Sequence, residues 1–70
     1  MAEATRPALT VRQRQVLDLI ADGKSAVEIG AVLDISPATA KTHIQKVFER
    51  YGVSSRAHAV ATGFRAGDLR

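Results

Sequence analysis

Apolar residues recur at helical spacing in four successive stretches of the 70-residue chain. Within each stretch they follow the i, i+3, i+4 pattern that places side chains on one face of an α-helix. No stretch shows the strict alternation that is typical of a half-buried strand. The pattern therefore predicts an all-α, tetrahelical domain with helices over residues 11–22, 26–33, 37–51 and 55–66.

Residues suited to helix ends stand at the boundaries of these stretches. In a capping box, a Ser or Thr and a Glu or Gln three residues later satisfy free backbone amides at a helix start. Glycine, in turn, often ends a helix in the left-handed conformation. The candidates are the capping boxes Thr10 with Gln13 and Ser25 with Glu28, the caps Ser36 and Ser54 or Ser55, and the terminal glycines Gly23, Gly52 and Gly67.

The second and third helices are joined by three residues, Asp34, Ile35 and Ser36. So short a turn forces the helices to cross at a steep angle, which is the geometry of a helix-turn-helix. Asp34 tolerates the left-handed conformation that such a turn requires, and Ile35 is expected to tuck beneath the helices. Gly30 inside the second helix predicts a close approach by the third helix. A short helical hairpin without a ligand is the alternative that this spacing leaves open.

The two faces of the third helix differ in chemistry. Its apolar stripe is predicted to face the core and consists of Ala40, Ile44, Val47, Phe48 and Tyr51. The opposite face carries Lys, Thr and Gln side chains, and Glu49 is its first acidic residue. Such side chains suit base edges and phosphates, and a B-form major groove admits one α-helix. This face favours DNA binding, although a solvated face that happens to lack acids is the alternative.

Composition limits the classes of function that remain for this chain. The net charge of +3 is compatible with a polyanionic partner, and the absence of cysteine excludes a disulfide framework or thiolate metal site. Two distant histidines, His43 and His58, lack acidic partners at ligand spacing, so no metal or cofactor is predicted. No nucleophile–base pair indicates an enzyme. No apolar run approaches the roughly 20 residues of a membrane span, so a cytoplasmic protein is expected.

The fourth helix carries small residues opposite its expected core stripe of Ala57, Val60, Ala61 and Phe64. A solvated helix would normally place Lys and Glu there, so the small residues suggest close contact with a second helix. We therefore predict a dimer interface, and its residues are Ala59, Thr62, Gly63 and Ala66. An alanine-rich surface without a partner is the alternative.

The sequence resembles the DNA-binding domain of the LuxR-type regulators, which is the output domain of many bacterial response regulators and quorum sensors. The resemblance covers residues 9–69 and is carried by a dense set of matches: Leu9-Thr10, Arg12, Val16-Leu17, Gly23, Ser25, Ile29, Leu33, Ile35-Ser36, Thr39, Lys41, His43, Gly52-Val53, Ser55-Arg56 and Ala59-Val60. It implies transcription regulation through a helix-turn-helix with residues 37–51 as recognition helix. It also implies pairing through the last helix on two-fold sites.

Carried over residue by residue, the resemblance implies two kinds of DNA contact. Base edges would be contacted by Lys41, Thr42 and Gln45. Phosphates would be contacted by Lys24, Ser25, Thr39 and Lys46. The chain departs from the family where a glutamate is usual at Gln13 and an asparagine is common at Lys46. The first departure removes any ion pair made there, and the second adds charge. The turn glycine often found in the family is Asp34, and the branched residue usual before the helix lysine is Ala40.

We expect residues 1–8 to form a flexible tail or linker stub and residues 9–70 to form the DNA-binding domain. Eight residues are too few for a receiver or sensing domain, so the chain is either an excised output domain or a free-standing regulator. Two other functions remain open. One is a sigma-factor-like promoter-recognition module, which would need RNA polymerase as partner, and the other is a protein-interaction module. The operator, the regulated genes, the input signal and the direction of regulation are not encoded in these patterns.

Overall fold

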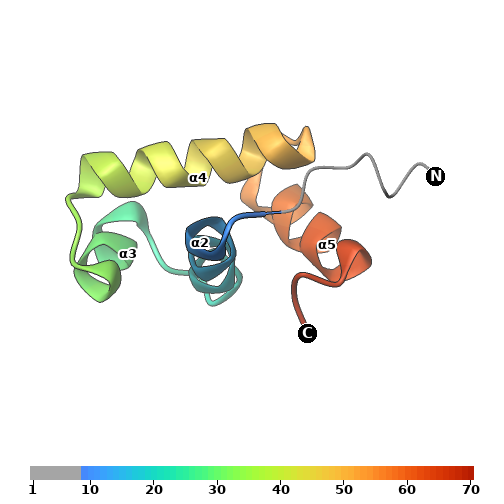
Figure 1. Ribbon diagram of the computed structural model, residues 1–70, viewed down its shortest axis with the longest axis horizontal. Coiled ribbons are helices and arrows are strands. Elements are labelled where there is room, and N and C mark those ends of the chain that lie inside the picture. The colour runs from blue at the N-terminus through green and yellow to red at the C-terminus, as the bar shows by residue number, and fades with distance from the viewer. Residues whose placement is uncertain (1–8) are drawn as a thin grey trace.

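The computed structural model describes residues 9–70, and this part of the chain contains four α-helices and no strand (Figure 1). They are α2 (Val11–Ala21), α3 (Ala26–Leu33), α4 (Pro37–Tyr51) and α5 (Arg56–Ala66). The all-α prediction is confirmed, and the predicted bounds of α3 and α4 are correct. Helix α2 ends one residue earlier than predicted, and α5 begins one residue later. The predicted tail over residues 1–8 lies outside the described residues.

The helix starts follow the predicted caps. In the first capping box, the Thr10 side chain accepts from the Gln13 amide at 3.1 Å, and the Thr10 amide donates to Gln13 Oε1 at 2.9 Å. The equivalent pair of bonds joins Ser25 and Glu28. Ser55, rather than its neighbour, caps α5 by accepting from the His58 amide. Because each bond satisfies a backbone amide that the helix leaves free, these starts are fixed by local sequence.

Helix α4 is the element around which the others are arranged. It packs against α2, α3 and α5, and α5 also packs against α2. In Figure 1, α4 runs along one edge of the molecule, with α3, α2 and α5 following one another beneath it. One side of α4 is therefore covered by three helices, while its opposite side is open.

The core gathers residues from all four helices and from the chain ends that flank them. Each of its members is at most 7% exposed. They are Leu9, Val16, Leu17, Ile20, Ile29, Ala40, Ile44, Val47, Ala59 and Leu69. The predicted inner stripe of α4 is confirmed, because Ala40, Ile44 and Val47 are buried and Phe48 and Tyr51 pack against them half-buried.

The turn between α3 and α4 has the predicted helix-turn-helix form. Asp34 adopts the left-handed conformation, with φ of 59° and ψ of 47°, and Ile35 is half-buried against the core. A Cβ on Gly30 would stand 2.6 Å from the Ile35 carbonyl oxygen and 3.4 Å from the Pro37 nitrogen. The close approach predicted at Gly30 therefore exists, and it is made by the backbone of the turn and the first residue of α4.

Each of three helices leaves an apolar position exposed. Ala21 at the end of α2 is exposed, and so is Val32 of α3, at 59%. The third is Phe64 of α5, which is 53% exposed although it was placed in the core stripe. Helix α3 has eight residues and contacts its neighbours along one narrow side. Some of its apolar residues therefore lie outside this contact and remain exposed.

Helix α5 turns a different face toward the core from the predicted one. Ala59 is fully buried and Gly63 is buried as well, whereas Ala57 is exposed. The assignment of Ala59 and Gly63 to a partner-facing surface is therefore wrong, because both lie in the protein's own core. A Cβ on Gly63 would meet side-chain atoms of Leu17 and Leu69 at 2.9 Å, so the small residue is what lets α5 approach α2. Thr62 is half-buried and Ala66 exposed.

Candidate nucleic-acid interface

The open side of α4 carries a row of exposed polar side chains. Thr39, Lys41, Thr42, Gln45 and Lys46 are all exposed, as the predicted groove-facing set requires. They occupy the first three turns of the helix, whose inner side is held against α2 and α3. Ser36 and Pro37 begin this helix, so its free amides also open toward solvent at the same end. A single rigid element thus presents ammonium, amide and hydroxyl groups on one surface.

The hydroxyl groups on this surface are partly engaged within the helix. Thr42 Oγ1 donates to the Ala38 carbonyl at 3.2 Å. Its hydroxyl proton is therefore used, which leaves a methyl group and an acceptor oxygen for a ligand. Ser36 Oγ donates to Thr39 Oγ1 at 2.9 Å and accepts from the Thr39 amide at 3.1 Å. Within this pair the Thr39 hydroxyl oxygen accepts, so the Thr39 hydroxyl proton is not used in it and suits an anionic oxygen.

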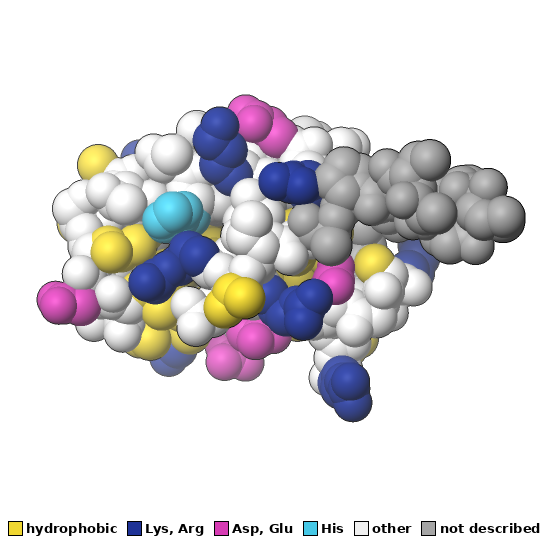
Figure 2. All heavy atoms as spheres, in the orientation of Figure 1, with side chains coloured by type: hydrophobic (Ala, Val, Ile, Leu, Met, Phe, Trp, Pro, Cys, Tyr) yellow, Lys and Arg dark blue, Asp and Glu magenta, His cyan; other side chains and the backbone are white. Residues whose placement is uncertain are grey.

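Positive and negative side chains are unevenly distributed over the surface. Figure 2 shows Lys and Arg side chains separated by uncharged surface, with the acidic side chains lying mostly toward the margins of that face. On α4 itself, Glu49 follows the last predicted contact, Lys46, by almost one turn. The first three turns of α4 therefore present positive charge without an opposing carboxylate from the same helix.

The structure places Lys24 and Ser25 apart from the α4 row. They line a hollow of about 660 Å³ together with Ile20, Gly23, Arg56, Ala57 and Val60, and no α4 residue contributes to it. The Ser25 amide is already bonded to the Glu28 carboxylate at 2.8 Å. This bond, the side-chain bond between the same residues and the charge of Lys24 lower the pKa of Glu28, so a negative charge sits at the start of α3. Ser25 therefore has its hydroxyl, not its amide, to offer a phosphate.

The two histidines lie on different helices. His43 is half-buried beside the polar row of α4, and His58 is exposed on α5. Within residues 9–70, no group of three or more His, Cys, Asp or Glu side chains is placed to hold a metal ion.

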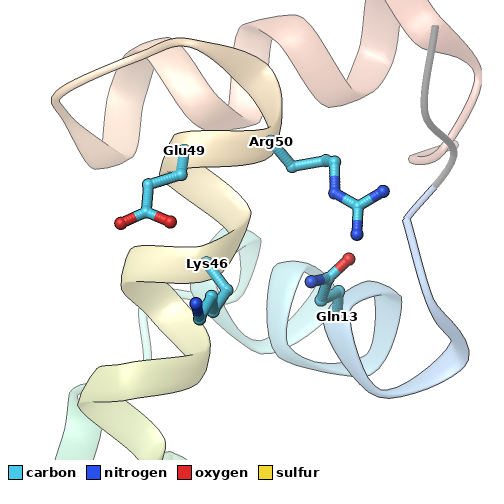
Figure 3. Close-up of a pocket in the computed structure, with 4 residues that line it drawn as sticks. All are labelled: Gln13, Lys46, Glu49 and Arg50. Carbon is cyan, nitrogen blue, oxygen red and sulfur yellow. The ribbon is translucent and has the colours of Figure 1, made fainter.

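Two arginines and one glutamine contribute contacts that the periodicity did not single out. Arg56 donates from Nη1 to the Lys24 carbonyl at 2.7 Å, which ties the start of α5 to the turn between α2 and α3. Gln13 and Arg50 line a second hollow together with Lys46 and Glu49, where α2 meets the C-terminal half of α4 (Figure 3). The capping signal identified Gln13, but its neighbours across the hollow follow from the crossing of two helices.

A tight helix-turn-helix with a polar and basic second helix defines a DNA-binding domain of the helix-turn-helix class. The chain belongs to the luxR family of bacterial regulatory proteins, whose family model matches residues 7–62. It is thus the DNA-binding domain of a transcription regulator and not an enzyme. In the described part of the chain, no helix is both long and apolar enough to cross a membrane.

Comparison with individual proteins agrees with this assignment. The chain is 47% identical over 64 residues to a probable transcriptional regulatory protein NarL of Mycobacterium tuberculosis, covering 91% of this chain and 30% of that protein. It is 37% identical over 65 residues to the spore germination protein GerE of Bacillus subtilis, covering 93% of this chain and 88% of GerE. The solved structure of transcription factor GerE superposes with a TM-score of 0.83 at 34% identity, over 93% of this chain and 97% of that one. The chain spans less than a third of the NarL protein and most of GerE.

Proposed function

We propose that the chain binds double-stranded DNA in a sequence-specific manner with α4 in the major groove. The observation that carries this proposal is the exposed row on α4, in which hydrogen-bonding and cationic side chains are held on a rigid helix whose first three turns contain no carboxylate. Lys41 and Gln45 are suited to pair with guanine and adenine edges, and the Thr42 methyl group is suited to contact thymine. Such a protein would act in the cytoplasm, where bacterial DNA is found.

Phosphate contacts would position the helix in the groove without reading sequence. Thr39 and Lys46 flank the base-reading residues on the same surface, so they are the principal candidates. We retain Lys24 and Ser25 as weaker contacts, made through the ammonium and the hydroxyl group. Their contribution is expected to be smaller because the Glu28 carboxylate lies beside them.

Selection from a random duplex pool, followed by fluorescence anisotropy on the selected sequence across a salt series, tests this proposal. Because each good base contact contributes about 1–3 kcal/mol, the triple variant Lys41→Ala, Gln45→Ala, Lys46→Ala is expected to lose at least about a hundredfold in affinity. Wild-type affinity should fall steeply as salt rises. Recovery of no motif, or equal binding by the variant, would favour the protein-interaction alternative. Binding by the domain alone argues against the sigma-like alternative, which requires RNA polymerase.

We further propose that two copies pair through the exposed side of α5 on two-fold sites. This side carries Phe64, Ala57 and the half-buried Val60, and Val60 lies where two hollows meet. One hollow ends at the cations Lys24 and Arg56. The other, of about 490 Å³, has an acidic rim formed by Asp18, Asp22 and Asp68, with Arg70 also lining it. A two-fold axis would bring the basic end of one copy against the acidic end of the other, which makes the surface self-complementary.

The pairing proposal is tested by comparing a paired site with a single half-site. Phe64→Ala removes an exposed ring, so it is expected to weaken binding to the paired site and spare the half-site, since pairing on DNA acts through effective concentration. Val11→Ala is a matched control, because Val11 is a 78% exposed apolar residue on another helix. Equal losses on both duplexes would contradict pairing through α5.

A further inference from the structure

Two threonines on the exposed row of α4 have hydroxyl groups in different hydrogen-bonding states. Thr39 lies in the first turn of the helix and Thr42 in the second, and both side chains are exposed. A threonine side chain can contact a ligand through its hydroxyl group or through its methyl group. The hydrogen bonds that each hydroxyl group already makes within the helix decide which of these two parts is available to DNA.

The hydroxyl group of Thr42 is bonded to its own helix. Its Oγ1 donates to the Ala38 carbonyl at 3.2 Å, and the direction is fixed because a carbonyl oxygen can only accept. The bond holds Oγ1 against the preceding turn, so the methyl group occupies another staggered position at Cβ. Ala38, one turn earlier, is exposed and small, so its side chain does not cover this methyl group. Thr42 therefore presents an accessible methyl group.

The hydroxyl group of Thr39 is in the opposite state. Ser36 Oγ accepts from the Thr39 amide at 3.1 Å and donates to Thr39 Oγ1 at 2.9 Å, so serine supplies the proton of this contact. The Thr39 proton is left for another acceptor. A hydroxyl group that already accepts a hydrogen bond is polarised and becomes a better donor. An ionised oxygen is the acceptor that gains most from such a donor.

We propose that Thr42 recognises thymine through its methyl group alone, whereas Thr39 donates its hydroxyl proton to a backbone phosphate. The inference rests on the proposed function and specifies the chemistry of two of its contacts. Thymine is the base that carries a C5 methyl group in the major groove, so Thr42 determines specificity as an apolar side chain would. A phosphate carries no sequence information, so Thr39 contributes affinity and position.

Valine and serine substitutions separate the two parts of the side chain. Valine keeps the shape of threonine without the hydroxyl group, and serine keeps the hydroxyl group without the methyl group. Thr39→Val, Thr39→Ser, Thr42→Val and Thr42→Ser form a crossed set in which each threonine is the control for the other. The cap of α4 uses the Thr39 amide, so it is retained in all four variants.

The thymine contact is tested on half-site duplexes of the selected sequence in which deoxyuridine replaces each thymine in turn. This replacement removes the C5 methyl group and keeps the hydrogen-bonding edge of the base. At one position, wild type and Thr42→Val should bind the uracil duplex about fourfold more weakly, which corresponds to one buried methyl group. Thr42→Ser should bind the two duplexes equally, and both Thr39 variants should discriminate as wild type does.

Two results would overturn the role of Thr42. One is a wild-type protein that discriminates at no thymine, or a Thr42→Ser variant that discriminates at every position where wild type does. The other is the reversed pattern, with base preference kept by Thr42→Ser and lost by Thr42→Val, because the hydroxyl oxygen would then contact the base.

The phosphate contact is tested with neutral methylphosphonates introduced one at a time into the same duplex. Thr39→Val should bind the unmodified duplex at least about tenfold more weakly than wild type, with the same preferred sequence, because a hydrogen bond to a charged group is lost. Thr39→Ser should lose less. One methylphosphonate should weaken wild-type binding and leave Thr39→Val unaffected.

Equal losses in Thr39→Val and Thr39→Ser, or the absence of such a methylphosphonate position, would overturn the role of Thr39. If wild-type protein binds no duplex, the proposed function itself fails. If it binds a selected sequence without the crossed pattern, this inference alone fails.

Discussion

Helices α4 and α5 are built to the same local plan, yet only the first shows its orientation in the sequence. Each begins at a serine N-cap and ends at a glycine in the left-handed conformation. On α4, large apolar residues face the core and polar residues face outward. On α5, the buried residues are Ala59 and Gly63, while Phe64 is largely exposed. The two faces of α4 differ in the polarity of their side chains, whereas the two faces of α5 differ in the size of their side chains.

The contrast shows when close packing overrides side-chain hydrophobicity. Burying Phe64 would remove more apolar surface from water than burying Ala59 and would favour the opposite orientation. The space between α5 and α2 is narrow, however, since a Cβ at Gly63 would lie 2.9 Å from Leu17 and Leu69. Only small residues fit a contact of that kind, and interiors are packed too densely to make room for a ring.

The largest expected effect comes from placing a charged side chain on the inner face of α5. Gly63→Lys should lower the free energy of unfolding by at least about 3 kcal/mol, because the side chain overpacks the contact with Leu17 and its charge is buried. Urea denaturation followed by circular dichroism measures the change. Ala57→Lys, on the exposed face, is the control and should shift stability by less than about 0.5 kcal/mol. Equal stability of both variants would mean that α5 faces the other way.

A smaller change in stability is expected from alanine substitutions at the two mid-helix glycines, Gly30 and Gly63, and its size should differ between them. Gly30→Ala should destabilise the domain by about 1–2 kcal/mol, because its Cβ meets the Ile35 carbonyl, and backbone moves at greater cost than a side-chain end. Gly63→Ala should cost less, since the leucine methyl groups can turn aside and alanine gains about 1 kcal/mol of helix propensity. Thermal melts of the two variants compare them directly. A Gly30→Ala variant at least as stable as the wild type would refute the close approach.

The smallest effect concerns the helix starts. At α3 a carboxylate and a hydroxyl group both accept from backbone amides, whereas α4 and α5 are capped by a serine hydroxyl group alone. The hydrogen bonds from Ser25 lower the pKa of Glu28 from its usual value, so this group contributes stability above its unfolded pKa and loses it as pH falls through the folded value. The stability difference between wild type and Glu28→Gln should therefore be present at neutral pH and vanish in acid. Urea midpoints at several pH values measure it. For Ser36→Ala at the start of α4, the difference should not depend on pH in this way.

The features that could be predicted from the sequence depend on interactions between residues that are close together in the chain. Caps such as Thr10 and Ser36 act over three residues, and their signals gave helix bounds within one residue of the structure. The tight turn was visible for the same reason, since Asp34 and Gly30 lie four residues apart. The outer row of α4 was predicted because Lys41 and Gln45 contrast in chemistry with the buried stripe.

The remaining features depend on contacts between distant segments. The inward face of α5 is set by Leu17 and Leu69, which no periodicity within α5 can reveal. The hollow beside Gln13 likewise exists because α2 crosses α4 near Lys46 and Arg50. Both features arise between elements, so they require the folded arrangement.

The central claim is that the outer face of α4 reads DNA while the inner face of α5 holds the core. Amide chemical-shift mapping of the domain, titrated with a half-site duplex of the selected sequence, tests it most directly. We predict the largest shifts at Lys41, Thr42, Gln45 and Lys46, with Ala57 and Phe64 little changed because a half-site recruits one copy. Large shifts at Ala57 and Phe64 with an unchanged α4 row would contradict the account.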